Sequence, residues 1–282
     1  MTNEIYGIDY LRRRLADKQT RVLLRYKYYE MKNNAQDFSS LAPEKFKGLK
    51  ETVGWCAKAV DSLADRLQFD EFQNDEFDLS EIFLSNNQDI LIDSAVLSAL
   101  ISACSFVYIR EDNGYPRLQV IDGSNATGII DPVTNLLTEG YAVLERDSMG
   151  VVKTEAYFMA GMTEIYSHGV LVQRIPNAAP YALLVPIIYR PDAKRPFGHS
   201  RISRACIAYT QTALRTIKRS EVSAEFYSFP QKYVLGLSED AEFNNRLATI
   251  SSFLNFTKDG DGDHPIVGQF QQQSICLLYT SP

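Results

Sequence analysis

Alternating carboxylates near the carboxyl end of the sequence have the residue types of a metal site. The run Asp259-Gly260-Asp261-Gly262-Asp263-His264 offers oxygen ligands of the kind that hard cations such as Ca²⁺ and Mg²⁺ prefer. The match to a calcium-binding loop fails, because that loop needs Gly where His264 stands and Glu where Phe270 stands. Asp-Gly repeats also form solvated turns. We expect a turn here and keep a metal-dependent phosphoesterase or nuclease as an alternative.

Histidines and cysteines give no support to nucleophilic or zinc-dependent catalysis. His168, His199 and His264 stand in Gly- or Pro-rich turns, without a nucleophile-elbow, zinc-protease or phosphate-loop motif. The cysteines lie far apart in apolar contexts and lack CxxC spacing. They are Cys56, Cys104, Cys206 and Cys276. We therefore expect reduced core cysteines, no metal, no cofactor and no enzymatic activity.

Composition is that of a globular protein. With 282 residues, of which 45% are hydrophobic and 23% charged, the chain is long enough to bury a core in one large or two smaller domains. The net charge of -6 argues against a protein that grips nucleic acid over its whole surface. No run approaches the roughly 18 apolar residues of a membrane span, and Met1-Thr2-Asn3-Glu4 lacks a signal-peptide plan. We expect synthesis in the cytoplasm and no membrane partner.

Three helical blocks precede the strands that would complete the fold. The first, residues 8–32, is the most basic stretch of the chain, and it indicates either a solvated helix or a monomeric nucleic-acid-binding module. A second helix is predicted after Pro43, with Trp55 packed beside an apolar stripe. The stripe consists of Val53, Cys56, Val60, Leu63 and Leu67. A third block covers 79–104, with a break near Asn86-Asn87. Its predicted core stripe is Ile90, Ser94, Leu97, Ile101 and Cys104.

From Ser105 the pattern changes to short alternating runs separated by Asp, Asn and Gly turns, which predicts an antiparallel meander. The predicted strands are 106–110, 118–121, 126–130, 140–145, 152–159, 163–166 and 170–174. Prolines then indicate an extended connector. They are Pro176, Pro180, Pro186, Pro191 and Pro196. Helices followed by an antiparallel sheet predict an α+β domain.

A run without Gly or Pro over 200–228 predicts one long helix. Small and weakly apolar residues recur along one side, which favours packing beside another helix. They are Ile202, Cys206, Tyr209, Ala213, Ile217, Ser220, Ala224 and Tyr227. The other surface carries cations. They are Arg201, Arg204, Arg215, Lys218 and Arg219. Because the helix dipole disfavours cations at its start, Arg201 and Arg204 need a compensating partner.

The order of these features resembles the portal proteins of tailed bacteriophages, particularly the siphophage group, in which Pro-Phe-Gly-x-Ser leads into a long helix. Four segments carry the resemblance. They are Arg25-Tyr26-Lys27-Tyr28-Tyr29-Glu30, Val60-Asp61-Ser62-Leu63-Ala64-Asp65-Arg66-Leu67, Pro196-Phe197-Gly198-His199-Ser200-Arg201-Ile202 and Phe229-Pro230-Gln231-Lys232-Tyr233-Val234-Leu235-Gly236-Leu237. The resemblance implies that residues 1–196 form a wing domain, 197–228 a stem helix and 229–275 part of a clip.

It also implies a structural role without catalysis. Portal subunits form a closed ring, expected here to be dodecameric, at one vertex of the virion capsid after assembly in the host cytoplasm. Double-stranded DNA passes through the ring during packaging and ejection, and the ring docks the terminase large subunit, the head-to-tail adaptor, and capsid and scaffold proteins. The five cations named above become candidate tunnel or intersubunit residues. A negative net charge suits a channel, since tight binding of phosphates would stall the DNA.

The carboxyl end departs from the portal pattern. Portals of this group continue past the clip into a second stem helix, a tunnel loop, a wing helix and a crown. The run Cys276-Leu277-Leu278-Tyr279-Thr280-Ser281-Pro282 resembles the translation of a transposon-end sequencing adapter. We expect residues 276–282 to be a non-native tail on an amino-terminal fragment, and a native apolar strand is the alternative. Without its partner stem helix, such a fragment would assemble poorly.

Overall fold

Helices at the start of the chain and antiparallel strands in its middle confirm the predicted α+β class. The computed structural model describes residues 5–32, 51–228, 232–235 and 266–269. The chain forms two units, one of Met1–Ala35 and Thr52–Ala213 and the other of Gln36–Glu51 and Leu214–Pro282. Their boundary falls inside helix α5 (Arg204–Ser228), which begins in the first unit and ends in the second.

Four helices lead the first unit among the residues described. They are α1 (Ile8–Tyr29), α2 (Trp55–Ala64), α3 (Leu79–Ser85) and α4 (Gln88–Ser102). The predicted break at Asn86-Asn87 is confirmed, because Asn87 adopts a left-handed conformation with φ of 53° between α3 and α4. Asparagine tolerates that conformation better than most residues, so the chain can change direction there.

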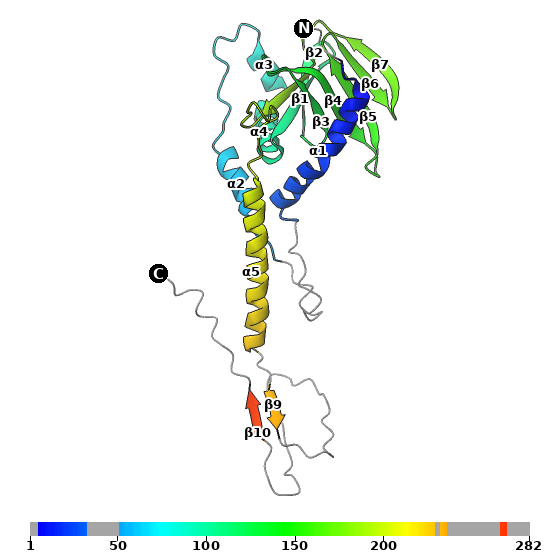
Figure 1. The fold of residues 1–282 in the computed structure, drawn as a ribbon. Helices are drawn as coiled ribbons and strands as arrows, with labels where there is room; N and C mark the ends of the chain where they lie inside the picture. Colours follow the sequence, from blue (N-terminus) through cyan, green and yellow to red (C-terminus); the bar gives the residue numbers. More distant parts are fainter. Residues whose placement is uncertain (1–4, 33–50, 229–231, 236–265, 270–282) are drawn as a thin grey trace. The chain divides into compact units, whose positions relative to one another are not determined.

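A five-stranded antiparallel meander forms the larger sheet (Figure 1). Its strands pair in chain order. They are β3 (Ala126–Ile130), β4 (Leu137–Arg146), β5 (Val152–Met159), β6 (Met162–Ser167) and β7 (Val170–Pro176). The sequence predicted β3 and β5 with these same bounds, because Asp, Asn and Gly turns separate runs that alternate between the two faces of the sheet.

The prediction of one continuous meander is wrong for the first two strands. Strands β1 (Cys104–Asp112) and β2 (Tyr115–Ile121) belong to a second sheet, of order β2-β1-β8. Strand β8 (Leu184–Ile188) lies in the predicted proline-rich connector and pairs with β1. Pro186 fits within β8 because this strand is at the edge of the sheet, where a missing N–H interrupts no ladder on the outer side.

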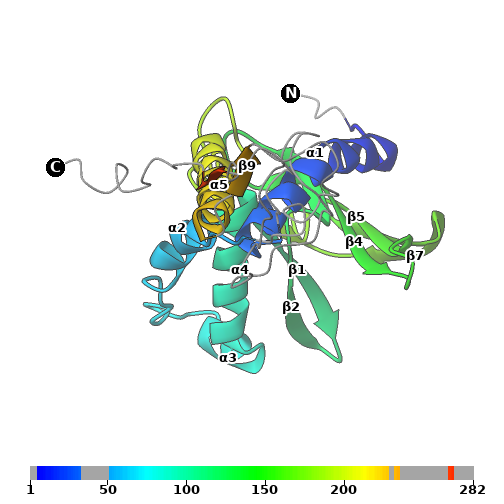
Figure 2. The same ribbon diagram turned by 90° about the horizontal axis from the view of Figure 1, so that it is seen from below.

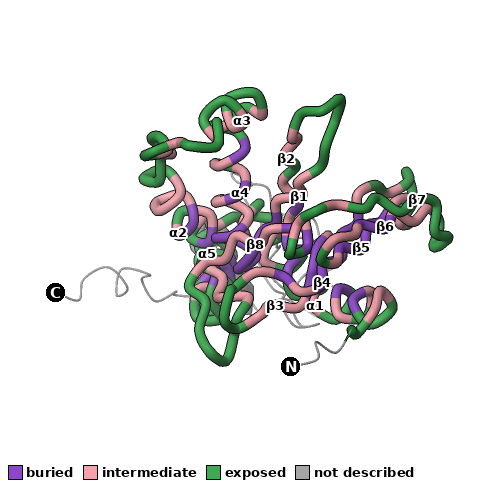
Figure 3. The backbone as a smooth tube through the Cα atoms, turned by 90° about the horizontal axis from the view of Figure 1, so that it is seen from above, coloured by how far each residue is buried: buried purple, intermediate pink, exposed green. Residues whose placement is uncertain are grey.

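The larger sheet has a core on each face. Helix α1 lies across one face, where Leu11 and Leu15 pack with Tyr141, Val143 and Tyr157 (Figure 2). The opposite face packs against the three-stranded sheet. This second cluster includes Phe106, Tyr108, Ala142, Phe158 and Leu184. Strands β4 and β5 are therefore largely buried, whereas β7 is exposed along its whole length (Figure 3).

A third core cluster joins α1, α2 and α4 to the start of α5 in the first unit. Cys56, Val60, Ile101 and Ile202 are its most deeply buried members. The predicted stripes on α2 and α4 are therefore correct at Cys56, Val60 and Ile101. They are wrong at Leu67 and Ile90, which are exposed, and the packing role predicted for Trp55 is wrong as well. Trp55 opens α2 and its side chain is 55% exposed, since it falls beside the face that carries Cys56 and Val60.

Helix α5 buries a stripe of residues spaced four apart. The stripe begins at Ile202, just before the helix, and continues with Cys206, Thr210, Leu214 and Lys218, of which Cys206 is half-buried. The predicted seam shares its first two members and then diverges, because steps of exactly four advance around a helix of 3.6 residues per turn. Tyr209 is 69% exposed, and Ile217 and Ser220 are exposed too.

In the second unit, strands β9 (Lys232–Leu235) and β10 (Ile266–Gln269) form an antiparallel pair in which Leu235 is opposite Ile266. The rest of the segment 229–237 and the Asp259–Asp263 cluster lie outside the described residues, as does the predicted tail 276–282. No helix among the described residues is long and apolar enough to cross a bilayer.

Candidate functional site

The segment from Pro196 to Ile202 completes the carboxyl end of α4. The last four carbonyl groups of a helix lack partners within the helix. In α4 the carbonyl of Leu100 accepts the N–H of Arg201 at 2.8 Å, and that of Ile101 accepts the Ser200 hydroxyl at 2.6 Å. Arg25 of α1 donates to the Ser102 carbonyl at 2.9 Å. The motif that precedes α5 is therefore fixed to the end of a buried helix.

Arg201 finds here the compensating partner that the sequence required. Its Nε donates to the carbonyl of Ala59 in α2 at 2.9 Å, and its guanidinium is 3.4 Å from the Tyr189 hydroxyl. Ser203 then accepts the N–H of Cys206 at 3.2 Å, which satisfies one of the free amides of the first turn of α5. Three helices of the first unit thus meet within a few residues of this arginine.

Gly198 allows the motif to pass close to the connector. Its φ is 73°, and an added Cβ would lie 2.2 Å from the Tyr189 carbonyl oxygen. That carbonyl accepts the N–H of His199 at 2.9 Å, while the Tyr189 N–H donates to the Ala103 carbonyl at 2.9 Å. Only glycine combines a positive φ with so close a backbone approach. The backbone conformation and the close approach to Tyr189 therefore explain why the Pro-Phe-Gly-x-Ser motif needs glycine at this position.

Phe197 anchors the motif through two cations of α1. The Arg14 guanidinium lies 5.4 Å and the Lys18 ammonium 5.8 Å from the centroid of the Phe197 ring. Lys18 also lies 5.3 Å from the Phe106 ring and donates to the Ala126 carbonyl at 2.5 Å. Burial lowers the pKa of Lys18 from its ordinary value. Cation–π contacts of this kind are worth about 0.5–2 kcal/mol each, so α1 helps to hold the start of α5.

An exposed turn before the motif pairs His199 with Asp192. The two side chains meet at 2.5 Å, and Arg195 donates to the other ring nitrogen of His199 at 3.3 Å. The bond to His199, with backbone N–H donors, lowers the pKa of Asp192. The Asp192 carboxylate also accepts the N–H groups of Lys194 and Arg195, so it closes the turn. This histidine orders a turn, and nothing here aligns it with a nucleophile.

The five cations predicted for α5 do not share one environment. Arg201, Arg204, Arg215 and Arg219 are exposed, and the spacing 204–215–219 puts the last three on one side of the helix. Lys218 is instead 2% exposed. Its predicted position on the open cationic surface is wrong, because it follows Thr210 and Leu214 at steps of four along the buried stripe.

Beneath α1 lies a layer of carboxylates and tyrosines that sequence reasoning missed. It consists of Glu139, Tyr141, Glu155, Tyr157, Glu164 and Tyr166. The three glutamates are buried and each accepts a hydrogen bond from a tyrosine of the layer. The signal was present in the sequence, since Thr-Glu-x-Tyr occurs at 138–141, 154–157 and 163–166. Each copy sends its Glu and its Tyr to the same face of a strand.

The layer holds α1 at two points. The Glu139 carboxylate accepts the N–H groups of Tyr6 and Gly7, at 2.9 and 3.0 Å, and so caps the amino terminus of α1. Glu155 accepts a bidentate bond from Arg12, whose pKa it raises further above the ordinary value. Such pairing offsets the cost of burying a carboxylate. The network is structural, because every carboxylate in it is already occupied.

Alkaline pH should weaken this interface. Burial and the neighbouring carboxylates raise the pKa of Tyr141 and Tyr157 well above 10, and that of Tyr166 to about 12. When the pKa of a tyrosine is higher in the folded state than its ordinary value of about 10, the stability gained is complete below pH 10. That stability is lost as the pH rises toward the pKa of the folded state. We expect the urea midpoint to be flat from pH 8 to 9.5 and to fall steeply between pH 10 and 12. Phenolate absorbance should appear together with unfolding. The urea midpoint of a Tyr157→Phe variant should fall less than that of the unchanged protein between pH 10 and 12. A midpoint that stays constant to pH 12 would contradict the assignment.

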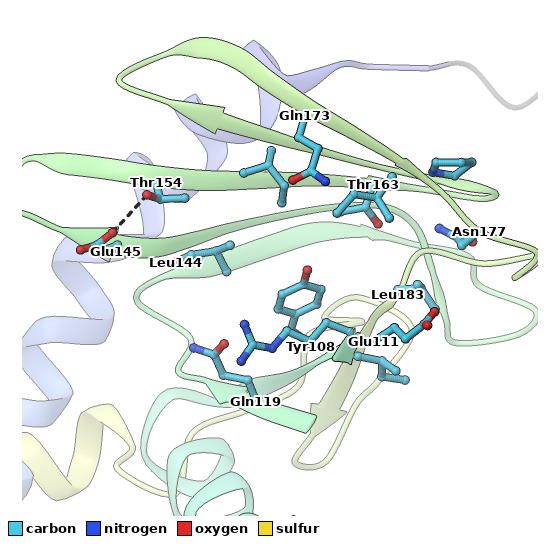
Figure 4. A pocket seen from close by; sticks show the side chains of 15 residues that line it. Tyr108, Glu111, Gln119, Leu144, Glu145, Thr154, Thr163, Gln173, Asn177 and Leu183 are labelled. Atoms are coloured by element: carbon cyan, nitrogen blue, oxygen red, sulfur yellow. Dashed lines mark hydrogen bonds between the residues drawn. The ribbon is translucent and has the colours of Figure 1, made fainter. Parts of the chain in front are cut away.

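A cavity of about 660 Å³ opens on the other face of the larger sheet (Figure 4). Tyr108, Leu144, Thr163 and Gln173 are among its lining residues. Two carboxylates, Glu111 and Glu145, also line it, and Glu145 is engaged, 2.7 Å from Lys153 and 3.2 Å from Thr154. The Thr163 hydroxyl lacks a hydrogen-bond partner, but that oxygen is closed off from solvent. The described residues that line the cavity include no histidine or cysteine.

Much of the positive charge of the basic helix α1 is engaged in contacts within the fold. Arg12, Arg14, Lys18 and Arg25 make the contacts given above with Glu155, Phe197, Ala126 and Ser102. The remaining cations are exposed. They are Arg13, Arg21 and Lys27. A helix that was to read phosphates would keep more of its cations at the surface, which weighs against the nucleic-acid-binding alternative.

No protein-family model matches this chain, and no curated protein matches it. Within the ranges that the structure describes, no group of three or more His, Cys, Asp or Glu side chains is arranged to hold a metal ion. The strongest local feature is the junction at Phe197–Arg201, which joins α1, α2 and α4 to the start of α5.

Proposed function

We propose that this chain is a structural subunit of a bacteriophage portal ring. The observation that carries the proposal is the contrast along α5. Ser200 and Arg201, just before its first turn, are bonded to α4 and α2, yet Tyr209, two turns from Ile202, is 69% exposed. Exposed apolar side chains that recur along one helix, here Tyr209 and Ile217, favour a protein partner. In a closed ring that partner is the next identical copy, in a heterologous contact.

Two further features support the proposal. The Pro-Phe-Gly-x-Ser motif, on which the portal resemblance depends, fixes the start of α5 in the first unit. A ring requires this, because the helix must keep the same orientation in every copy. Arg204, Arg215 and Arg219 lie on the side of α5 away from the buried Thr210. In a ring, these arginines would face DNA or a neighbouring subunit, while the net charge of -6 would limit tight binding.

In this role the chain performs no catalysis. The ring would stand at one vertex of the capsid, pass double-stranded DNA during packaging and ejection, and dock the terminase large subunit, the head-to-tail adaptor, and capsid and scaffold proteins. A dodecamer is the stoichiometry that the portal resemblance implies.

The test is assembly of the protein expressed from the complete gene. Electron microscopy and mass photometry should show closed rings. Tyr209→Glu places a charge in the proposed contact, and we expect at least a tenfold higher concentration for half-assembly. Met149→Glu is the matched control, since Met149 is 89% exposed in a turn and should leave the rings intact. A monomer at micromolar concentration, or unimpaired assembly of Tyr209→Glu, would overturn the proposal.

Phosphodiester hydrolysis separates the enzyme alternative from the ring. A portal subunit should show no hydrolysis with Mg²⁺ or Mn²⁺. Activity that depends on these ions and is abolished by Asp261→Ala would favour the metal-dependent phosphoesterase instead.

A further inference from the structure

Two cysteines that are 150 positions apart in the sequence meet in the third core cluster. The Sγ atoms of Cys56 in α2 and Cys206 in α5 are 3.4 Å apart. Cys56 is fully buried and also lies 3.4 Å from the Thr210 hydroxyl, whereas Cys206 is half-buried. The sequence predicted unconnected thiols, because nothing in the local pattern indicates that α2 and α5 are neighbours.

The surroundings hold both thiols in place. Cys206 stands in the first turn of α5, where its N–H is bonded to Ser203, and that turn is fixed by the contacts of Arg201. Both residues belong to the first unit. A disulfide has a sulfur–sulfur distance of about 2.05 Å, so closure requires an approach of about 1.4 Å. Side-chain rotation with a small helix shift can supply that distance.

We propose that Cys56 and Cys206 are an oxidisable pair that closes into a disulfide on exposure to a low-molecular-weight disulfide. The inference stands apart from the proposed function, since it depends only on the first unit of a single chain. The site is a dithiol, and the chemical class of its co-reactant is an aliphatic disulfide such as oxidised glutathione.

The reaction proceeds by two exchanges. The Cys206 thiolate attacks a sulfur of the small disulfide, forms a mixed disulfide and releases one small thiol. The Cys56 thiolate then attacks the Cys206 sulfur, forms the protein disulfide and releases the second small thiol. Two protein thiols are oxidised and one small disulfide is reduced to two thiols, so protons and electrons balance.

Access and acidity set this order. Cys206 is the sulfur that a reagent in solution reaches, because Cys56 is 0% exposed. Burial raises the pKa of Cys56 to about 11, which makes it a poor first nucleophile at neutral pH. Once Cys206 carries a leaving group within contact distance, the high local concentration of Cys56 favours closure.

The bond would link α2 to the first turn of α5. It would also close a loop of about 150 residues, which restricts the unfolded chain strongly. By the usual dependence of the melting temperature on stability, Tm should rise by about 10 °C. Oxidation thereby converts a contact between two helices into a covalent one.

The experiment uses the whole chain with Cys276→Ser, incubated with oxidised glutathione at pH 8. We expect loss of two of the three remaining thiols, a proteolytic peptide pair that links Cys56 to Cys206, faster migration on a non-reducing denaturing gel, and the rise in Tm. Dithiothreitol should reverse all four changes. Cys206→Ser should abolish them, and Cys104→Ser should leave them intact, because Cys104 belongs to a different core cluster.

Two results would overturn the inference. One is a stable glutathione adduct on Cys206 with no linkage to Cys56, which would mean that the helices cannot approach. The other is a linkage that involves Cys104, since it would form only through unfolding of the core.

Discussion

Replacing Gly198 with alanine should lower the free energy of unfolding by about 3–4 kcal/mol and lower Tm by about 10 °C. The positive φ of 73° alone costs an L-residue about 1–2 kcal/mol. The larger cost comes from the new Cβ, which would lie 2.2 Å from the Tyr189 carbonyl oxygen and force that backbone away from His199. Urea denaturation and thermal unfolding measure the loss.

Gly150→Ala provides the matched control for the backbone effect. Gly150 has a φ of 80°, and an added Cβ at this position would have nothing within 4 Å of it. Its substitution should cost about 1–2 kcal/mol, the penalty for the positive φ without a clash. Equal losses in the two variants would show that the close approach of Gly198 to Tyr189 contributes nothing to the stability of the junction.

Removing the cation from Arg12 should destabilise the protein by about 2–3 kcal/mol. Arg12→Met keeps an aliphatic side chain on α1 but leaves the Glu155 carboxylate, which is 6% exposed, without its charged partner. The Tyr141 hydroxyl remains as its hydrogen-bond donor, and the partial exposure of Arg12 lets water in, so the loss stays below that of a fully buried pair. Equilibrium urea unfolding gives the difference directly.

Arg13→Met makes the same chemical change one position along the helix. Arg13 is exposed, so its replacement should alter the stability by less than about 0.5 kcal/mol. Similar stabilities for the Arg12 and Arg13 variants would mean that the pairing with Glu155 adds no net stability to the interface between α1 and the sheet.

Much of the fold was predictable because the local signals agreed. Turn residues bounded β3 and β5 correctly, and Asn86-Asn87 marked the break between α3 and α4. Strand β8 was missed because Pro186 argues against a strand, and only its place at the edge of the sheet makes the proline acceptable. Whether a strand is at an edge is a property of the whole sheet, so one segment of sequence does not reveal it.

The site was harder to predict than the fold. The sequence indicated that Phe197, Gly198 and Ser200 matter. It did not indicate that Ser200 would bond to a carbonyl of α4 or that cations of α1 would contact Phe197. The repeated Thr-Glu-x-Tyr pattern was visible, yet its meaning depends on the register that sets β4 beside β5. The contact between Cys56 and Cys206 likewise depends on tertiary packing. Trp55 shows the opposite error, since an aromatic residue beside a core stripe is left at the surface.

The bonds between the motif and the end of α4 have a mechanical consequence. Because the N–H of Arg201 and the hydroxyl of Ser200 end on carbonyls of Leu100 and Ile101, a pull along the first turns of α5 loads α4 through two hydrogen bonds. No flexible linker between the motif and α4 has to extend before this load is transmitted. Tension on this helix is therefore borne by a buried part of the first unit, whose rupture would require the core around Ile101 and Ile202 to open.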